Sequence, residues 1–123
     1  MPGRNWVRLN NLFSVKDKVA VITGGMGQLG ICYIQALMER GARVAVFDLQ
    51  ERPDTNKEWF KKQTGSAGLS VHRVDITAKN EIKEAGRKVL DRWGTIDILI
   101  NNAALDSPPD APAEEVGPFE TYP

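Results

Sequence analysis

The stretch Lys18–Gly30, KVAVITGGMGQLG, decides how the rest of the chain can fold. Its first part, Val19–Ile22, is a short apolar and partly β-branched run, typical of a parallel strand that is covered on both faces. A helical pattern follows the glycines, so free N–H groups and the positive end of a helix dipole point out of the turn. The stretch therefore predicts a strand, a turn that can seat an anion such as a pyrophosphate, and a helix. Glycine-rich turns also occur as plain connectors, so the motif alone leaves both interpretations open.

Size and charge limit the possible functions. The 123 residues suffice for one domain, and 16 basic residues balance 16 acidic ones, which gives no basis for non-specific binding to nucleic acid or to a membrane. Cys32 is the one cysteine, which favours a reducing compartment, and with His72 as the one histidine no metal site is expected. No apolar run approaches the about 18 residues of a membrane span, and the N-terminus lacks the apolar core of a signal peptide. We expect a cytoplasmic protein.

Apolar periodicity predicts three further strands and three helices. The strands are expected at 42–47, 69–74 and 96–100, and the helices at 29–40, within 51–63 and after Thr77, which can serve as a cap. Strands joined by helices run parallel with right-handed crossovers. The predicted fold class is therefore α/β, a partial doubly wound parallel sheet (Rossmann-like) with strand order 3-2-1-4.

The predicted packing faces and segment boundaries follow from the same patterns. We expect 1–17 to be a lead-in, 18–104 to be the nucleotide-binding unit and 105–123 to be a proline-rich loop. In the lead-in, Leu12, Phe13 and Val15 are expected to tuck under the sheet edge. The first helix should pack through Gly30, Tyr33, Ile34 and Leu37 and stop at Gly41, and the last through Ile82, Ala85, Gly86, Val89, Leu90 and Trp93.

The fold brings four polar or glycine-rich segments to one edge, since the carboxyl ends of parallel strands lie together and ligands bind there. Asp48 ends the second strand and Asp75 the third, while the Asn-Asn-Ala-Ala turn follows the fourth. The predicted cofactor-binding residues are Gly24, Met26, Gly27, Gln28, Leu29, Gly30, Asp48, Leu49, Asp75, Ile76, Asn102, Ala103 and Ala104.

Asp48 sets the expected cofactor. It follows Gly24 by 24 residues (48 minus 24), about the offset of an acid that binds the adenosine ribose hydroxyls. Its charge would repel a 2′-phosphate by up to about 4 kcal/mol at 4 Å and an effective dielectric near 20, so we predict NAD over NADP. Arg52 could weaken this preference, whereas Arg43 lies at the other end of the strand. A solvated strand-end acid is the alternative interpretation.

Asp75 and Asn102, which also lie at this edge, each allow two interpretations of their role. Asp75 and Ile76 could hold the adenine edge, or Asp75 could cap the following helix. Asn102 could satisfy backbone groups where two strands separate, or form a simple Asx turn. The small Ala103 and Ala104 leave space for a ribose or a ring.

Taken together, these residues resemble the short-chain dehydrogenase/reductase family over about 13–122. The resemblance rests on Thr23–Gly30, Asp48, Asp75–Thr77 and Ile96–Ala104. The glycines read Thr-Gly-x-x-Gly-x-x-Gly, as in the extended branch of the family, with Gln28 where the single-domain branch has glycine. The Asn-Asn-Ala-Ala turn resembles the single-domain branch, which we follow. The resemblance implies an NAD-dependent oxidoreductase that interconverts an alcohol and a ketone, often as a homo-oligomer.

The family's catalytic residues are missing from this sequence. They are a serine and a Tyr-x-x-x-Lys pair, in which tyrosine is the general acid/base and lysine lowers its pKa. Only Tyr33 and Tyr122 occur, and neither has a lysine four residues later. The catalytic residues are therefore expected beyond Pro123, and this chain alone is expected to be inactive. A non-catalytic nucleotide-binding or scaffold module is the alternative. A methyltransferase is a third, but Thr23 stands where those enzymes usually carry an acid.

Overall fold

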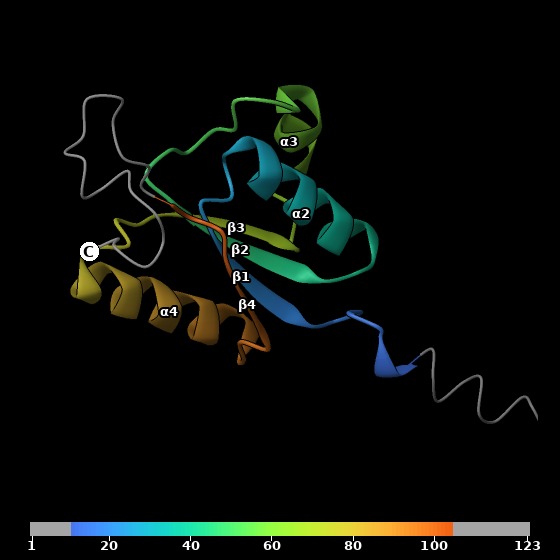
Figure 1. The fold of residues 1–123 in the computed structure, drawn as a ribbon. Coiled ribbons are helices and arrows are strands. Elements are labelled where there is room, and N and C mark those ends of the chain that lie inside the picture. Colours follow the sequence, from blue (N-terminus) through green and yellow to red (C-terminus); the bar gives the residue numbers. More distant parts are fainter. Residues whose placement is uncertain (1–10, 105–123) are drawn as a thin grey trace, which may run out of the picture.

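The computed structural model describes residues 11–104, which form one parallel sheet with helices on both faces (Figure 1). Along the chain the elements are β1 (Val19–Thr23), α2 (Gln28–Glu39), β2 (Arg43–Asp48), α3 (Lys57–Gln63), β3 (Leu69–Arg73), α4 (Lys79–Trp93) and β4 (Ile98–Asn101). The strand order is β3-β2-β1-β4, and all three pairings are parallel. The predicted fold class and strand order are confirmed, with element bounds shifted mostly by one or two residues.

The sheet carries a core on each face, and this explains the unbroken apolar run of β1. Ile22 and its register partner Val46 face α2 and α3, while Val21 and its partner Ala45 face α4. Figure 1 shows α2 and α3 above the sheet and α4 below it. Each fully buried valine or isoleucine contributes roughly 1.5–3 kcal/mol relative to exposure, so every position of the run stabilises the sheet.

The predicted packing face of α2 is partly wrong. Gly30 and Ile34 are buried as expected, and Gly41, with a φ of +86°, follows the end of the helix. Tyr33, however, is 39% exposed, and Ile31 is buried in its place. The helix presents Ile31 and Ile34, three residues apart, to the sheet, which turns Tyr33 toward solvent.

The predicted face of α4 and its cap also need correction. Ala85 and Val89 are buried, but Ile82 is exposed and Leu90 is 46% exposed, so the contact stripe is narrower than predicted. The helix begins after Ala78, which makes no side-chain cap, so Thr77 is not the cap. The amide and hydroxyl of Thr77 instead donate to Asp75.

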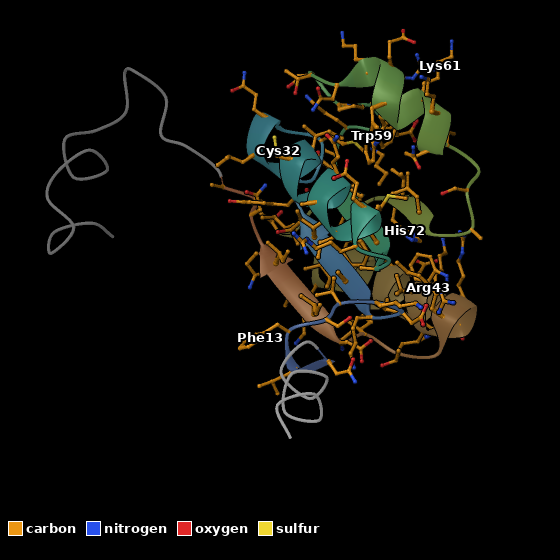
Figure 2. The ribbon with its side chains drawn as sticks, turned by 90° about the vertical axis from the view of Figure 1, so that its right-hand side faces the viewer. Phe13, Cys32, Arg43, Trp59, Lys61 and His72 are labelled. Carbon is orange, nitrogen blue, oxygen red and sulfur yellow. The ribbon has the colours of Figure 1, made fainter. Side chains whose placement is uncertain are left out.

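The lead-in packs as predicted only in part, because Val15 is half-buried whereas the two residues before Ser14 are not. Leu12 and Phe13 are exposed, Phe13 by 81%, and Figure 2 shows Phe13 at the periphery of the molecule. The same view places Trp59 between α3 and α2, where it packs against the core of that face. The predicted proline-rich loop at 105–123 and the first ten residues of the lead-in lie outside the described residues.

Candidate nucleotide-binding site

Two glycines of the loop after β1 are required by the fold itself. Gly24 has a φ of +65°, and a Cβ there would lie 2.7 Å from the Cα of Ala103 in the turn after β4. A Cβ on Gly30 would lie 2.5 Å from the Cα of Gly25, so only glycine lets α2 start this close to the loop. Contacts within the protein therefore require glycine at these two positions, whether or not the loop binds a ligand.

Gly27 differs, because nothing in the protein crowds it. A Cβ there would meet only the carbonyl oxygen of Gly24, at 3.6 Å, and its backbone is extended with φ −75° and ψ 175°. Gly27 precedes the first turn of α2, where the N–H groups of Gln28, Leu29 and Gly30 have no acceptor among the described residues. The absent side chain leaves the donors of Gln28 and Leu29, which line the hollow described below, open to a ligand, and this arrangement binds phosphate at a helix N-terminus.

Asp48 ties the tip of β2 to this loop. One of its carboxylate oxygens, Oδ2, accepts the Met26 N–H at 2.9 Å, and Oδ1 accepts the Gln50 N–H at 2.9 Å. A carboxylate offers about four acceptor positions, so each oxygen keeps capacity for a ribose hydroxyl. The Met26 carbonyl in turn accepts the N–H of Asp54 at 3.3 Å. The solvated strand-end acid considered from the sequence therefore does not describe Asp48.

The turn after β4 is fastened to the same loop. The Thr23 hydroxyl accepts the N–H groups of Asn102 at 3.2 Å and Ala103 at 3.1 Å. The Asn102 side-chain amide donates to the Gly24 carbonyl at 2.9 Å. Asn102 thus satisfies backbone groups where β1 and β4 separate, and it is not a simple Asx turn.

Asp75 makes a local turn. Its Oδ1 accepts the Thr77 hydroxyl at 2.6 Å and the Thr77 N–H at 2.9 Å. The side-chain hydrogen bond, and then the backbone one, hold the pKa of Asp75 below its usual 3.8. The second oxygen of the carboxylate, Oδ2, accepts no hydrogen bond from the described residues and stays available to a donor such as an exocyclic amine.

These segments enclose a hollow of about 600 Å³ at the carboxyl edge of the sheet. Of the predicted site residues, Met26 and Gly30 do not line it: Met26 is fully buried in the core and Gly30 is covered by the loop. The predicted residues that do line it are Gly24, Gly27, Gln28, Leu29, Asp48, Leu49, Asp75, Ile76, Asn102, Ala103 and Ala104.

Sequence reasoning missed four lining residues: Phe47, Gln50, Asp54 and Val74. Phe47 and Val74 carry a usable signal, because each precedes a predicted strand-end acid. Asp54 carries none, since it lies in a polar loop that returns to the site only through its contact with Met26. Within 11–104 no group of three potential metal ligands gathers, and no helix is long and apolar enough to cross a bilayer.

Comparison with known proteins agrees with this geometry. The sequence pattern of the family described as short chain dehydrogenase matches residues 18–121. The chain belongs to the short-chain dehydrogenase family, and the methyltransferase alternative is thereby wrong.

Individual relatives show how much of such an enzyme is present. A sorbitol dehydrogenase of Cereibacter sphaeroides is 37% identical over 90 residues, which are 72% of this chain and 33% of that protein. A (+)-borneol dehydrogenase of Salvia officinalis is 29% identical over 92 residues, 75% of this chain and 32% of that protein. The chain spans about a third of the length of these curated relatives.

Solved structures share the fold and include complexes with the cofactor. A 3-ketoacyl-(acyl-carrier-protein) reductase from Brucella melitensis, complexed with NADH, aligns with a TM-score of 0.66 and 27% identity over 88% of this chain and 42% of that one. A short chain dehydrogenase from Leptospira borgpetersenii with bound NAD⁺ aligns with a TM-score of 0.62 and 30% identity over 76% of this chain and 34% of that one.

Proposed function

We propose that this chain is the cofactor-binding portion of an NAD-dependent oxidoreductase that interconverts an alcohol and a ketone. The observation that carries the proposal is a single hollow with unpaired helix N–H donors on one wall and the Asp48 carboxylate on another. The donors suit a diphosphate, and the carboxylate suits the hydroxyls of an adenosine ribose. Bound nicotinamide would supply the hydride acceptor or donor.

Each residue then has a definite task. The N–H groups of Gln28 and Leu29 bind the diphosphate, and Asp48 orients the ribose. Asp75 and Ile76 flank the adenine, while Ala103 and Ala104 leave room for the remainder of the dinucleotide. No residue of this chain is assigned to proton transfer, because the sequence contains no Tyr-x-x-x-Lys. The alcohol or ketone is a partner of the longer enzyme in this proposal.

The alternative proposal is a module that binds the nucleotide without turning anything over. In either case we propose a homo-oligomer, because within the described residues β4 pairs only with β1, and Leu99 on it is 59% exposed. We also propose that the protein is cytoplasmic.

Calorimetry with the 123-residue chain tests the proposal. NADH and ADP-ribose should bind with similar affinity, because the site grips the diphosphate and adenosine, whereas nicotinamide mononucleotide should bind far more weakly. No turnover is expected with any secondary alcohol. Equal binding of nicotinamide mononucleotide and ADP-ribose would contradict the assignment, and measurable turnover would contradict the absence of catalytic groups.

A further inference from the structure

His72, labelled in Figure 2, lies on the edge strand β3, and the proposed function gives this residue no task. Within the described residues β3 pairs only with β2, so the other side of the strand has no neighbour. Phe47, the register partner of His72, belongs to the core that α4 covers. The half-buried His72 ring therefore lies between the sheet edge and α4.

The closest contacts of the His72 ring are uncharged. Its Nε2 shares a hydrogen bond with the hydroxyl of Ser70, which is buried two residues earlier on the same strand. From β2, Phe47 meets the ring edge to face, with 5.6 Å between the ring centroids and 77° between the ring planes. Neither Ser70 nor Phe47 carries a negative charge, so neither can neutralise a protonated ring.

The cations that act on the ring come from α4. Burial lowers the pKa of His72 below its usual 6.5, and the positive charges of Lys88 and then of Arg92 lower it further. Arg92 also holds the turn before β3, where its guanidinium donates to the carbonyls of Ser66 and Ala67 at 3.4 Å. The same helix that covers the ring therefore opposes its protonation.

Other charged groups also lie near the ring. Arg73, Glu81 and Glu84 line a small hollow of about 340 Å³ together with the ring. The carboxylate of Glu84 lies 3.9 Å from the ammonium of Lys88, and Glu81 accepts the Asp75 N–H at 3.5 Å. Both acids are exposed and face groups other than the ring, so they leave the effect of the α4 cations in place.

We propose that His72 makes the edge formed by β3 and α4 open locally in mildly acidic solution, while β1 and β2 stay paired. In the opened edge the ring regains its usual pKa of 6.5, whereas the closed edge holds the pKa lower. The free energy of opening is therefore constant above pH 6.5 and falls as the pH drops from 6.5 through the lowered value of the closed edge.

This opening would also disturb the nucleotide hollow, and that part of the inference rests on the proposed function. The chain that follows β3 contributes Val74, Asp75 and Ile76 to the lining of the hollow. Phe47 lines the hollow as well and contacts the His72 ring. A nucleotide should therefore bind the closed edge in preference to the open one, and its binding should hold the edge closed.

Amide hydrogen exchange of the 123-residue chain at about pH 7.5 and about pH 5.5 tests the inference. His72 is the one histidine of the chain, and no other side chain with an ordinary pKa changes its charge in this interval. At one pH unit below 6.5, protonation of the opened edge can favour opening by at most about tenfold. The protection of the β3 amides, corrected for the intrinsic pH dependence of exchange, should therefore fall severalfold, up to this limit.

Three variants show whether His72 causes this change. His72→Gln keeps a group that can hydrogen-bond to Ser70 but does not titrate, so the acid-induced loss of protection should disappear. Lys88→Gln removes a cation that acts on the ring and should make the loss smaller. Lys83→Gln, which removes an exposed cation elsewhere on α4, should behave like the unsubstituted chain. An undiminished loss in His72→Gln would overturn the inference.

Two measurements on the unsubstituted chain keep the inference testable if His72→Gln does not fold. The β3 amides should exchange faster than those of β1 at both pH values, and equal rates would overturn a local opening. In an NMR titration the His72 ring should titrate below pH 6.5, and titration at or above 6.5 would overturn the role of His72.

The link to the nucleotide has its own outcomes. Saturating NADH should restore the protection of the β3 amides at about pH 5.5, and bound NADH that leaves this protection unchanged would overturn the link. Failure of NADH to bind at about pH 7.5 would refute the proposed function, while an acid-sensitive edge that depends on His72 would still stand.

Discussion

Gly27→Ala separates the binding role of the glycine loop from its structural role. The Gly27 backbone is extended, and the nearest atom to an added Cβ is an oxygen at 3.6 Å, an ordinary contact. At a helix N-cap, alanine in place of glycine costs about 0.5–1 kcal/mol, and the lower entropy of the unfolded chain offsets about 0.4–1 kcal/mol. The free energy of unfolding should therefore change by no more than about 0.5 kcal/mol.

Binding should respond far more strongly. Gly27 lines the nucleotide hollow at the start of α2, so the new methyl group would stand in front of the free N–H groups. Loss of one hydrogen bond to a charged ligand costs about 1.5–3 kcal/mol, which corresponds to roughly a 10- to 150-fold weaker NADH complex.

Thermal unfolding and NADH titration on three alanine variants make this test sharp. Gly30→Ala should lose stability, because its Cβ would lie 2.5 Å from the backbone of Gly25. Gly86→Ala, in α4 with nothing within 4 Å of the added Cβ, should gain about 0.5–1 kcal/mol and bind NADH unchanged. NADH affinity in Gly27→Ala within twofold of the unsubstituted chain would refute the reasoning, because no ligand could then occupy the space over Gly27.

Other variants test the hydrogen bonds that hold the site and the strands around it. Thr23→Val should cost about 1–3 kcal/mol of stability because it leaves the Ala103 N–H without its acceptor and removes one of the two acceptors of the Asn102 N–H, and Thr23→Ser should restore most of it in chemical denaturation. Asp48→Ala should weaken NAD more than NADP in calorimetry; equal losses would speak against a ribose contact. Asp97 has its pKa lowered from 3.8, first by the Val19 N–H that its carboxylate accepts, so its stabilisation is present above pH 3.8 and lost as the pH falls through the lowered folded value. Asp97→Asn should therefore lower the melting temperature near neutral pH and make it less sensitive to acid, whereas Asp91→Asn, whose carboxylate accepts no bond from the described residues, should do neither.

The strand order was predictable because two separate patterns in the sequence indicate the same topology. Val19–Ile22 is typical of a strand covered on both faces, and the alternation of strands with helical segments leaves few topologies. The site edge followed from topology alone, which is why Asp48, Asp75 and Asn102 line one hollow although they lie far apart in sequence.

Side-chain orientation could not be predicted to the same depth. Tyr33 and Leu90 each fit a helical stripe, but a shift of one residue around the helix decides exposure, and only tertiary packing sets that rotation. Thr77 was predicted to cap α4 because a local turn made by Asp75 has the same sequence pattern as the start of a helix. In the structure, the amide and hydroxyl of Thr77 donate to Asp75 instead. Met26 was assigned to the ligand, yet its side chain fills the core and its N–H is taken by Asp48.

These ties give the site a property that a list of ligand contacts would miss. The loop is held from β2 through Asp48 and Met26, from the loop before α3 through Asp54, and from β4 through Thr23 and Asn102. All of these bonds join groups of the protein itself, so they fix the orientation of the free N–H groups of α2. A preorganised site loses less conformational entropy on binding, so more of the interaction energy shows as affinity. Because Asp48 holds the loop and is the residue that we propose to bind the ribose, we expect a change at this one residue to alter recognition of the ribose and of the diphosphate together.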